Sequence, residues 1–236
     1  MTLLEKVRRL NRLLQRAAGK PLNFGEMAEV LRETIHADVF VVSRKGKVLG
    51  SALTPDFPHM WLQREDPSGL RFSKETNDAL LKVGETAIEP PGGQFFGDSE
   101  PAFSGRYAII VPIVGGGDRL GTLVLASKDE MPEEDVLILA EYGATQIGME
   151  ILRERAEERE MEARKKTMVS VAANSLSFSE FDAVEHIFEE LEGKEGLLVA
   201  SKIADKAGIT RSVIVNALRK LESAGEIGRA SCRERV

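Results

Sequence analysis

The sequence predicts an α+β fold in which a sensor-type domain is joined by a long helix to a helix-turn-helix domain. Three observations lead to this prediction. Two pairs of short β-like segments are flanked by amphipathic helical segments, as in α+β domains. The helical run from 133 to 166 is too long for one compact domain. After it, two short helical segments are separated by a glycine, each with one apolar and one polar face.

Composition limits the class of protein. The 236 residues suffice for one large or two small domains, and 42% hydrophobic with 30% charged residues is ordinary for a globular protein. No apolar run is long enough to span a bilayer, and the amphipathic start lacks the continuous apolar stretch of a signal peptide. A single cysteine allows no disulfide within the chain. These features predict a cytoplasmic protein.

The first third predicts two helices and a hairpin. The first helix covers residues 3–18, and the second begins at a capping Asn23 and ends at Ile35. Two strands, 39–43 and 48–53, enclose the basic turn 44–47. The inward faces are predicted to contain Leu3, Leu4, Val7, Leu10 and Leu14 in the first helix, and Met27, Leu31 and Ile35 in the second.

A second hairpin is predicted from strands 109–114 and 120–126 around a glycine-rich turn, Gly115 to Arg119. A dinucleotide-binding loop would need a helix after the glycines, whereas β-like residues follow, so we interpret the glycines as a turn with positive φ angles. Between the hairpins, residues 54–106 hold six of the nine prolines and many aromatic residues. We interpret this irregular segment as either a ligand-binding loop or a surface excursion that folds over apolar residues.

The long helix is predicted over 133–166, with Leu137, Ala140, Ala144, Ile147 and Ile151 facing inward. From Arg153 onward, eleven of fourteen residues are charged, which is typical of a solvated connector held by i,i+4 pairs such as Glu160–Arg164. A further helix, capped by Ser179, is predicted to have Val184, Ile187, Phe188 and Leu191 on one face.

Residues 198–225 predict a helix-turn-helix. Ser201 is the expected cap of its first helix, Gly208 ends that helix, and Thr210 caps the next. In the second helix, Val213, Ala217, Leu218 and Leu221 are predicted inward, and Arg211, Ser212, Asn216, Arg219 and Lys220 outward. Residues 194–225 carry a net charge of +3 in a chain of −6, which favours DNA binding. Two alternatives stay open: a plain packing unit, or a docking module of a sensor that acts through protein contacts.

The segment VASKIADKAGITRSVIVNALRKLESAG resembles the DNA-binding signature of the CodY family of bacterial transcriptional regulators. Five further segments of the chain resemble the same family: AAGKPLNFGEMAEVLRETI, FVVSRKGKVLG, IVPIVGGGDRLGTLVL, LILAEYGATQIGMEILRE and SLSFSEFDAVEHIFEELEGKEGLL. The resemblance implies a GAF-like effector-binding domain at 1–132, a connecting helix at 133–168 and a winged helix-turn-helix domain at 169–225. It also implies a homodimeric repressor of nutrient and amino-acid metabolism genes that binds an AT-rich inverted repeat.

Where the family has a β-hairpin wing, this chain ends in EIGRASCRERV. These residues, 226–236, match the translation of a common sequencing-adapter read, so we interpret them as a sequence artefact and expect the wing to be missing. A chain without the wing is expected to bind DNA weakly.

The resemblance also implies site residues. The DNA-binding candidates are Ser201, Lys202, Thr210, Arg211, Ser212, Asn216, Arg219 and Lys220. Of these, Arg211, Ser212, Asn216 and Arg219 are expected at base edges, and Lys202 and Lys220 at phosphates.

The implied effectors are isoleucine, valine or leucine and, in many members, GTP. The effector-binding candidates are Met60, Arg64, Phe72 and Phe96, and the GTP-contact candidates are Ser43, Arg44, Lys45 and Lys47. An Arg-Met pair binds the effector in the family, whereas this chain has His59-Met60, so either Arg64 substitutes or the effector differs. No cofactor, metal site or catalytic residue is predicted, because the three histidines lie far apart and no nucleophile or phosphate-loop motif occurs.

Overall fold

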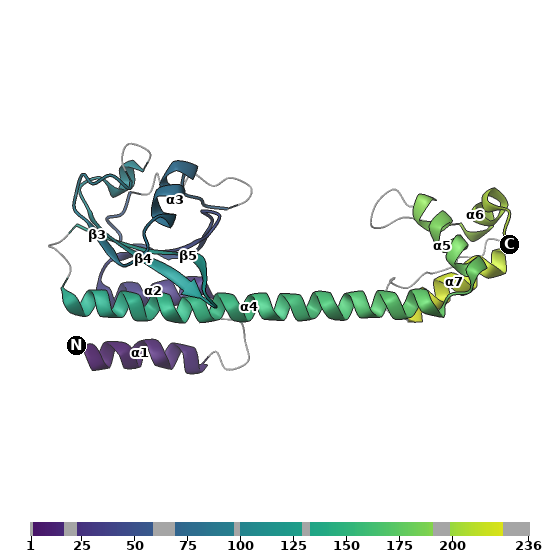
Figure 1. The fold of residues 1–236 in the computed structure, drawn as a ribbon, viewed down its shortest axis with the longest axis horizontal. Coiled ribbons are helices and arrows are strands. Elements are labelled where there is room, and N and C mark those ends of the chain that lie inside the picture. The colour runs from purple at the N-terminus through teal and green to yellow at the C-terminus, as the bar shows by residue number, and fades with distance from the viewer. Residues whose placement is uncertain are drawn as a thin grey trace. The chain divides into compact units, whose positions relative to one another are not determined.

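A computed structural model describes residues 2–16, 23–58, 69–96, 100–128, 133–190 and 199–223. The chain divides into two units, residues 1–156 and 157–236. The helix α4, Glu134–Ser175, belongs to both units (Figure 1). None of the helices among the described residues combines the length and apolar content that a membrane crossing needs.

The first unit is built on a five-stranded antiparallel sheet in the order β2-β1-β5-β4-β3. Its strands are β1 (Asp38–Ser43), β2 (Val48–Ala52), β3 (Ala87–Glu89), β4 (Tyr107–Gly115) and β5 (Asp118–Ser127). Both predicted hairpins are confirmed. The β4–β5 turn places Gly116 and Gly117 at φ of 62° and 85°, the positive values that favour glycine at a two-residue hairpin turn.

One face of the sheet is covered by α1 (Leu3–Arg16), α2 (Phe24–Ile35) and the first half of α4. The α2 helix begins as predicted, since the Asn23 side chain accepts a hydrogen bond of 2.8 Å from the Gly25 amide. In α1, Leu10 is buried and Leu3 and Val7 pack against the same core, but Leu4 is 57% exposed, which corrects its predicted inward position. The side chain of Leu14 lies outside the described residues.

The α4 helix packs on this face through the predicted Ala140, Ala144, Ile147 and Ile151, together with the fully buried Leu139, which the prediction missed. Its charged stretch is exposed from Ala156 onward and contains the predicted Glu160–Arg164 ion pair. The helix continues to Ser175, beyond the predicted end at Lys166. The sequence TMVSVAANS holds no glycine or proline that would stop it.

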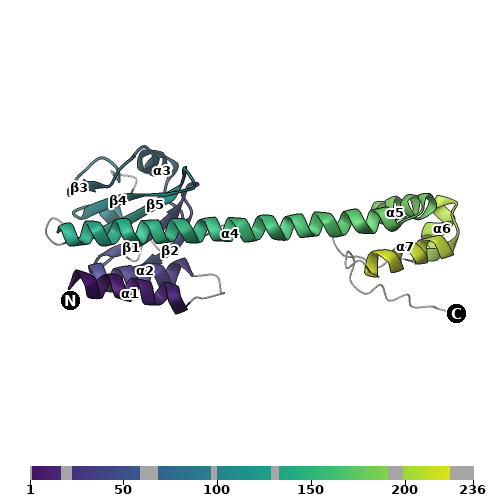
Figure 2. The same cartoon turned by 60° about the horizontal axis from the view of Figure 1, so that its bottom comes forward.

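The opposite face is covered by the segment that looked irregular in the sequence. It contains α3 (Lys74–Leu81), capped by Ser73, whose hydroxyl accepts a hydrogen bond of 3.1 Å from the Thr76 amide, then β3 and a short 3₁₀ turn, Pro101–Phe103. Figures 1 and 2 show α3 on the side of the sheet away from α1 and α2. The expectation that this segment folds over apolar residues is therefore confirmed.

The second unit contains three helices that pack together, α5 (Phe178–Glu190), α6 (Ala200–Ala207) and α7 (Arg211–Ser223) (Figure 2). The predicted cap of α5 at Ser179 is wrong. The Ser177 amide donates to Glu180 at 2.7 Å, and the Glu180 amide approaches the Ser177 hydroxyl at 3.4 Å. This reciprocal pair is a capping box. Phe188 is 61% exposed and not inward as predicted, whereas Ile187 is buried as predicted.

Candidate DNA-binding surface and effector pocket

The helix-turn-helix is held by a small apolar core. Its buried members are Ala183, Ile187, Ala200, Ile203, Ala204, Ile214 and Ala217, contributed by all three helices. The predicted inward residues Val213 and Leu218 are only partly buried, and Ile214, which the prediction missed, is fully buried. Gly208 ends α6 as predicted, at φ 68°. The predicted cap at Ser201 is wrong, because the cap position is Val199, two residues earlier, and no side chain caps the helix there.

The core leaves the opposite side of α7 exposed. Ser212, Asn216 and Arg219 recur at i, i+4 and i+7, so they share one stripe of the helix. Arg211 is exposed at its first turn, and Thr210 precedes it, with its hydroxyl 3.0 Å from that of Ser212. Two guanidinium groups, an amide and a hydroxyl are the donors and acceptors that read base edges in a major groove.

Three lysines of the second unit, Lys202, Lys206 and Lys220, lie in intramolecular ion pairs. Lys202 and Lys206 contact the two oxygens of Glu190 at 3.0 and 2.8 Å, and these bonds, Lys206 first, lower the Glu190 pKa to about 2. Lys220 contacts Glu180 at 2.7 Å and donates to the Ser175 carbonyl at 2.9 Å. The Lys220 bond lowers the Glu180 pKa to about 2. The phosphate contacts of Lys202 and Lys220 remain predictions, and each requires the lysine to exchange its internal partner for a phosphate.

In the first unit, five phenylalanines form one buried cluster over the sheet. Its members are Phe40, Phe57, Phe72, Phe96 and Phe103. The predicted pocket residues Phe72 and Phe96 lie together, with ring centroids 6.2 Å apart, and Phe96 stacks on Phe103 at 4.2 Å. Met60 and Arg64, and with them His59, fall outside the described residues.

A cavity of about 180 Å³ opens beside this cluster. Phe96, Phe103, Glu89 and Arg106 are among the residues that line it. A cavity of this size suits a small metabolite.

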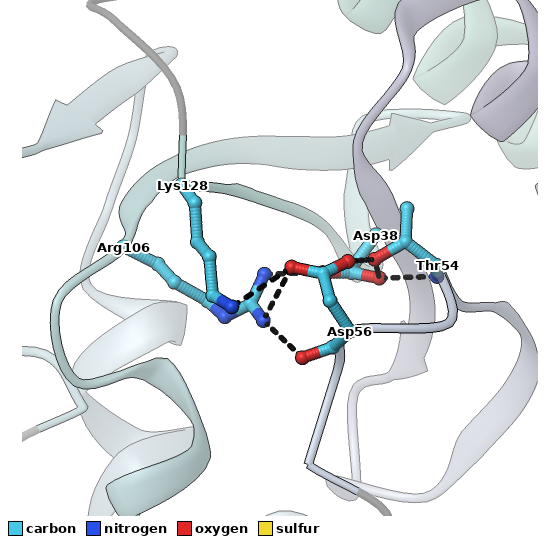
Figure 3. Close-up of polar contacts among 5 residues, drawn as sticks. All are labelled: Asp38, Thr54, Asp56, Arg106 and Lys128. Atoms are coloured by element: carbon cyan, nitrogen blue, oxygen red, sulfur yellow. Dashed lines mark hydrogen bonds and ion pairs between the residues drawn. The ribbon is translucent and has the colours of Figure 1, made fainter.

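The cavity-lining Arg106 belongs to a polar network that is buried at Arg106 and Asp38 and exposed at Asp56 and Lys128 (Figure 3). Its Nη1 contacts the Asp38 carboxylate at 2.8 Å, and its Nη2 donates to the Asp56 carbonyl at 3.0 Å. Thr54 donates to Asp38 from its amide at 2.6 Å and its hydroxyl at 2.8 Å, while burial raises the Asp38 pKa. The Asp56 carboxylate contacts Lys128 at 3.0 Å, and hydrogen bonds from Thr54 and then Lys128 hold its pKa well below the ordinary range.

Sequence reasoning missed Asp38, Arg106 and Glu89. A signal existed for the first two, because each is a charged residue at one end of a strongly apolar strand segment. Their pairing joins residues 68 positions apart, which no local pattern reveals.

The GTP-contact candidates lie in the β1–β2 hairpin. Arg44, Lys45 and Lys47 are exposed, and the Ser43 hydroxyl accepts from the Lys47 amide at 3.0 Å. The tip is held against α3, since Asn77 donates to the Arg44 carbonyl at 3.2 Å. The hairpin is thus an ordered tip that presents three cations.

Comparison with known proteins agrees with this architecture. The family model of the CodY GAF-like domain matches residues 2–175, and that of the CodY helix-turn-helix domain matches residues 194–232. The chain belongs to the CodY family. It is 55% identical over 233 residues to the global transcriptional regulator CodY of Brevibacillus brevis, covering 96% of this chain and 89% of the relative. The CodY of a Geobacillus species is 56% identical over 231 residues, with the same coverage of 96% and 89%.

Among solved structures, the cofactor binding GAF domain of the nutrient sensor CodY from Clostridium difficile is 34% identical. The match covers 64% of this chain and 99% of that domain, with a TM-score of 0.46. As a CodY family member, the chain is a DNA-binding transcriptional regulator with a GAF-like sensor domain. The relatives it matches are named as regulators and not as enzymes. The tail, residues 226–236, which is predicted to stand in place of the wing, lies outside the described residues.

Proposed function

We propose that this protein is a homodimeric repressor of nutrient and amino-acid metabolism genes whose affinity for an AT-rich inverted repeat rises when a branched-chain amino acid binds its sensor domain. A regulator that acts on chromosomal DNA in bacteria works in the cytoplasm. The observation that carries the DNA-binding part is the division of α7. Ile214 and Ala217 are fully buried, whereas Ser212, Asn216 and Arg219 share an exposed stripe.

The effector proposal is supported by the character of the pocket. A branched-chain amino acid needs an apolar wall for its side chain and polar groups for its charged end. The phenylalanine cluster supplies the wall, and charged residues line the adjoining cavity. Isoleucine, valine and leucine are the proposed effectors. GTP is a second proposed effector, contacting Arg44, Lys45 and Lys47 at the hairpin tip, where these three cations are exposed.

Fluorescence anisotropy with an AT-rich inverted-repeat duplex tests the DNA-binding part. Arg211→Ala is expected to weaken binding by about 1–3 kcal/mol and to relax sequence preference, whereas Lys202→Ala should weaken all duplexes equally and reduce the salt slope by about one. Unchanged operator affinity in Arg211→Ala would contradict the assignment. The comparison is relative, so it holds even where the absolute affinity is low.

The alternative is a sensor that acts through protein contacts, with the helix-turn-helix as a docking module. Salt dependence separates the two, because phosphate contacts release counterions and docking through apolar surface does not. A steep fall in duplex affinity between 50 and 200 mM salt, of about 10³-fold for six contacts, supports the DNA proposal. Light scattering of the free protein tests the dimer.

A further inference from the structure

The cavity of the sensor domain lies at one end of a row of residues that crosses the sheet, and Glu89 and Ala108 of that row line it. Glu89 of β3 is paired with Ala108 of β4, Ala108 with Ala126 of β5, and Ala126 with Asp38 of β1. Directly paired residues of neighbouring strands project from the same face. Two carboxylates are therefore separated by two alanines, whose short side chains leave space above the sheet.

The two carboxylates of this row differ in how their charge is balanced. Asp38 is paired with Arg106, whose guanidinium also reaches Asp56, and Asp56 is paired with Lys128. These two cations and two carboxylates balance each other. Glu89 makes no ion pair with any residue that the structure describes.

Glu89 is 6% exposed, and only one of its two carboxylate oxygens has a hydrogen-bond partner among the described residues. Its Oε1 accepts a hydrogen bond of 2.6 Å from the Phe95 amide, and its buried Oε2 has no hydrogen-bond partner among the described residues. Burying a carboxylate oxygen without a partner is costly, so such an atom beside a cavity indicates a ligand donor. Burial raises the Glu89 pKa, in agreement with the absence of a nearby cation.

The backbone also makes room for this side chain. A Cβ atom built on Gly93 would lie 2.1 Å from the Glu89 Cγ and 2.2 Å from its Oε1. Gly93 itself lines the cavity. A glycine at this position therefore allows the Glu89 carboxylate to occupy the cavity wall.

We propose that Glu89 binds the ammonium group of the amino-acid effector, with the stacked rings of Phe96 and Phe103 forming the apolar wall beside it. An ammonium group supplies both the missing donor and the missing positive charge. This inference rests on the proposed amino-acid effector and names the residue that recognises its amino group.

Calorimetric titration of the full chain tests the inference with two ligands and three variants. The ligands are isoleucine and 3-methylpentanoate, which has the same carbon skeleton without the amino group. Glu89→Gln removes the charge at nearly constant size, Glu89→Asp keeps the charge on a shorter side chain, and Glu85→Gln is the control at an exposed position of the same unit. We expect Glu89→Gln to weaken isoleucine binding about tenfold to a hundredfold and to leave 3-methylpentanoate binding unchanged. The isoleucine affinity of Glu89→Asp should lie between those of the parent and Glu89→Gln, and that of Glu85→Gln should match the parent.

Equal isoleucine affinity in Glu89→Gln and the parent would overturn the inference, and so would an equal loss of both ligands, which indicates a structural role. If Glu89→Gln fails to fold, Glu89→Asp is tested in the same way, by comparing its loss of isoleucine affinity with its loss of 3-methylpentanoate affinity. If the parent binds the duplex but no branched-chain amino acid, the branched-chain effector proposal fails while the DNA-binding proposal stands. The twenty amino acids are then screened with the same variants. If the parent binds none of the twenty amino acids, the proposed role of Glu89 is overturned as well. The anisotropy test of DNA binding with Arg211→Ala does not depend on this outcome.

Discussion

Replacing Arg106 with methionine tests the buried network of the sensor domain. The side chains of Arg106 and Asp38 are 3% and 1% exposed, so the variant leaves a buried carboxylate without its cation. At an effective dielectric constant of 20, the attraction over 2.8 Å is about 6 kcal/mol, of which desolvation of both groups offsets a large part. Thr54 still donates two hydrogen bonds to Asp38, so we expect a loss near the lower end of the 3–5 kcal/mol range, about 3 kcal/mol.

Urea unfolding followed by intrinsic fluorescence measures this loss in the intact chain. The single tryptophan and both tyrosines, Trp61, Tyr107 and Tyr142, belong to the first unit, so the signal reports that unit alone. With an m-value of about 1–3 kcal/mol/M, the midpoint should fall by about 1–3 M. Lys128→Met is the matched control, because the exposed Lys128–Asp56 pair should contribute less than about 1 kcal/mol.

Two further measurements separate charge from packing. Adding Asp38→Asn to Arg106→Met should recover part of the stability, because a neutral amide needs no cation. The loss should also shrink as the pH falls, since the folded-state pKa of Asp38 is raised and its protonation removes the unpaired charge. A loss below about 1 kcal/mol, or a double variant no more stable than Arg106→Met, would refute the reasoning.

Three other predictions follow from the structure. Gly50→Ala should destabilise the first unit by about 1–3 kcal/mol, because the new Cβ would lie 2.4 Å from the Phe24 carbonyl carbon; Gly84→Ala, with no atom within 4 Å, is its control in the same urea assay. Ile214→Ala should cost about 2–5 kcal/mol in thermal unfolding of the second unit, since Ile214 is fully buried; a loss below 1 kcal/mol would contradict its place in the core. The second unit should also lose stability as the pH falls from about 4.5 to about 2, because the bond from Lys220 holds the folded-state Glu180 pKa at about 2. Melting followed by circular dichroism should show a weaker dependence in Lys220→Met, and an unchanged one would refute the assignment.

Local patterns predicted the elements that local physics determines. Asn23 caps α2, Gly208 ends α6, and Gly116 and Gly117 of the β4–β5 turn take positive φ values as expected, whereas Gly115 belongs to β4. Each of these features depends on a few consecutive residues. The same holds for the apolar face of α4, which the 3.6-residue period identifies.

The errors arise where a distant contact decides the outcome. Phe188 fits the apolar period of α5, yet its side chain is exposed, whereas Ile214 did not stand out in the sequence and is at the centre of the second core. The α3 helix lies in a segment rich in proline and polar residues, so neither the helix nor its packing over the sheet was predicted. Likewise, Glu89 and Arg106 become neighbours of one cavity only when the sheet brings their strands together.

Ala108 bears on how the ligand selectivity of this sensor domain can change during evolution. It pairs directly with Glu89 and lines the cavity, so a branched side chain there, with two more heavy atoms, would reduce the space above the sheet. Selectivity for the size of the bound molecule can therefore shift by one nucleotide change in the codon, while recognition of its charged end stays in place. Paralogues that respond to shorter metabolites are expected to carry valine or threonine at this position.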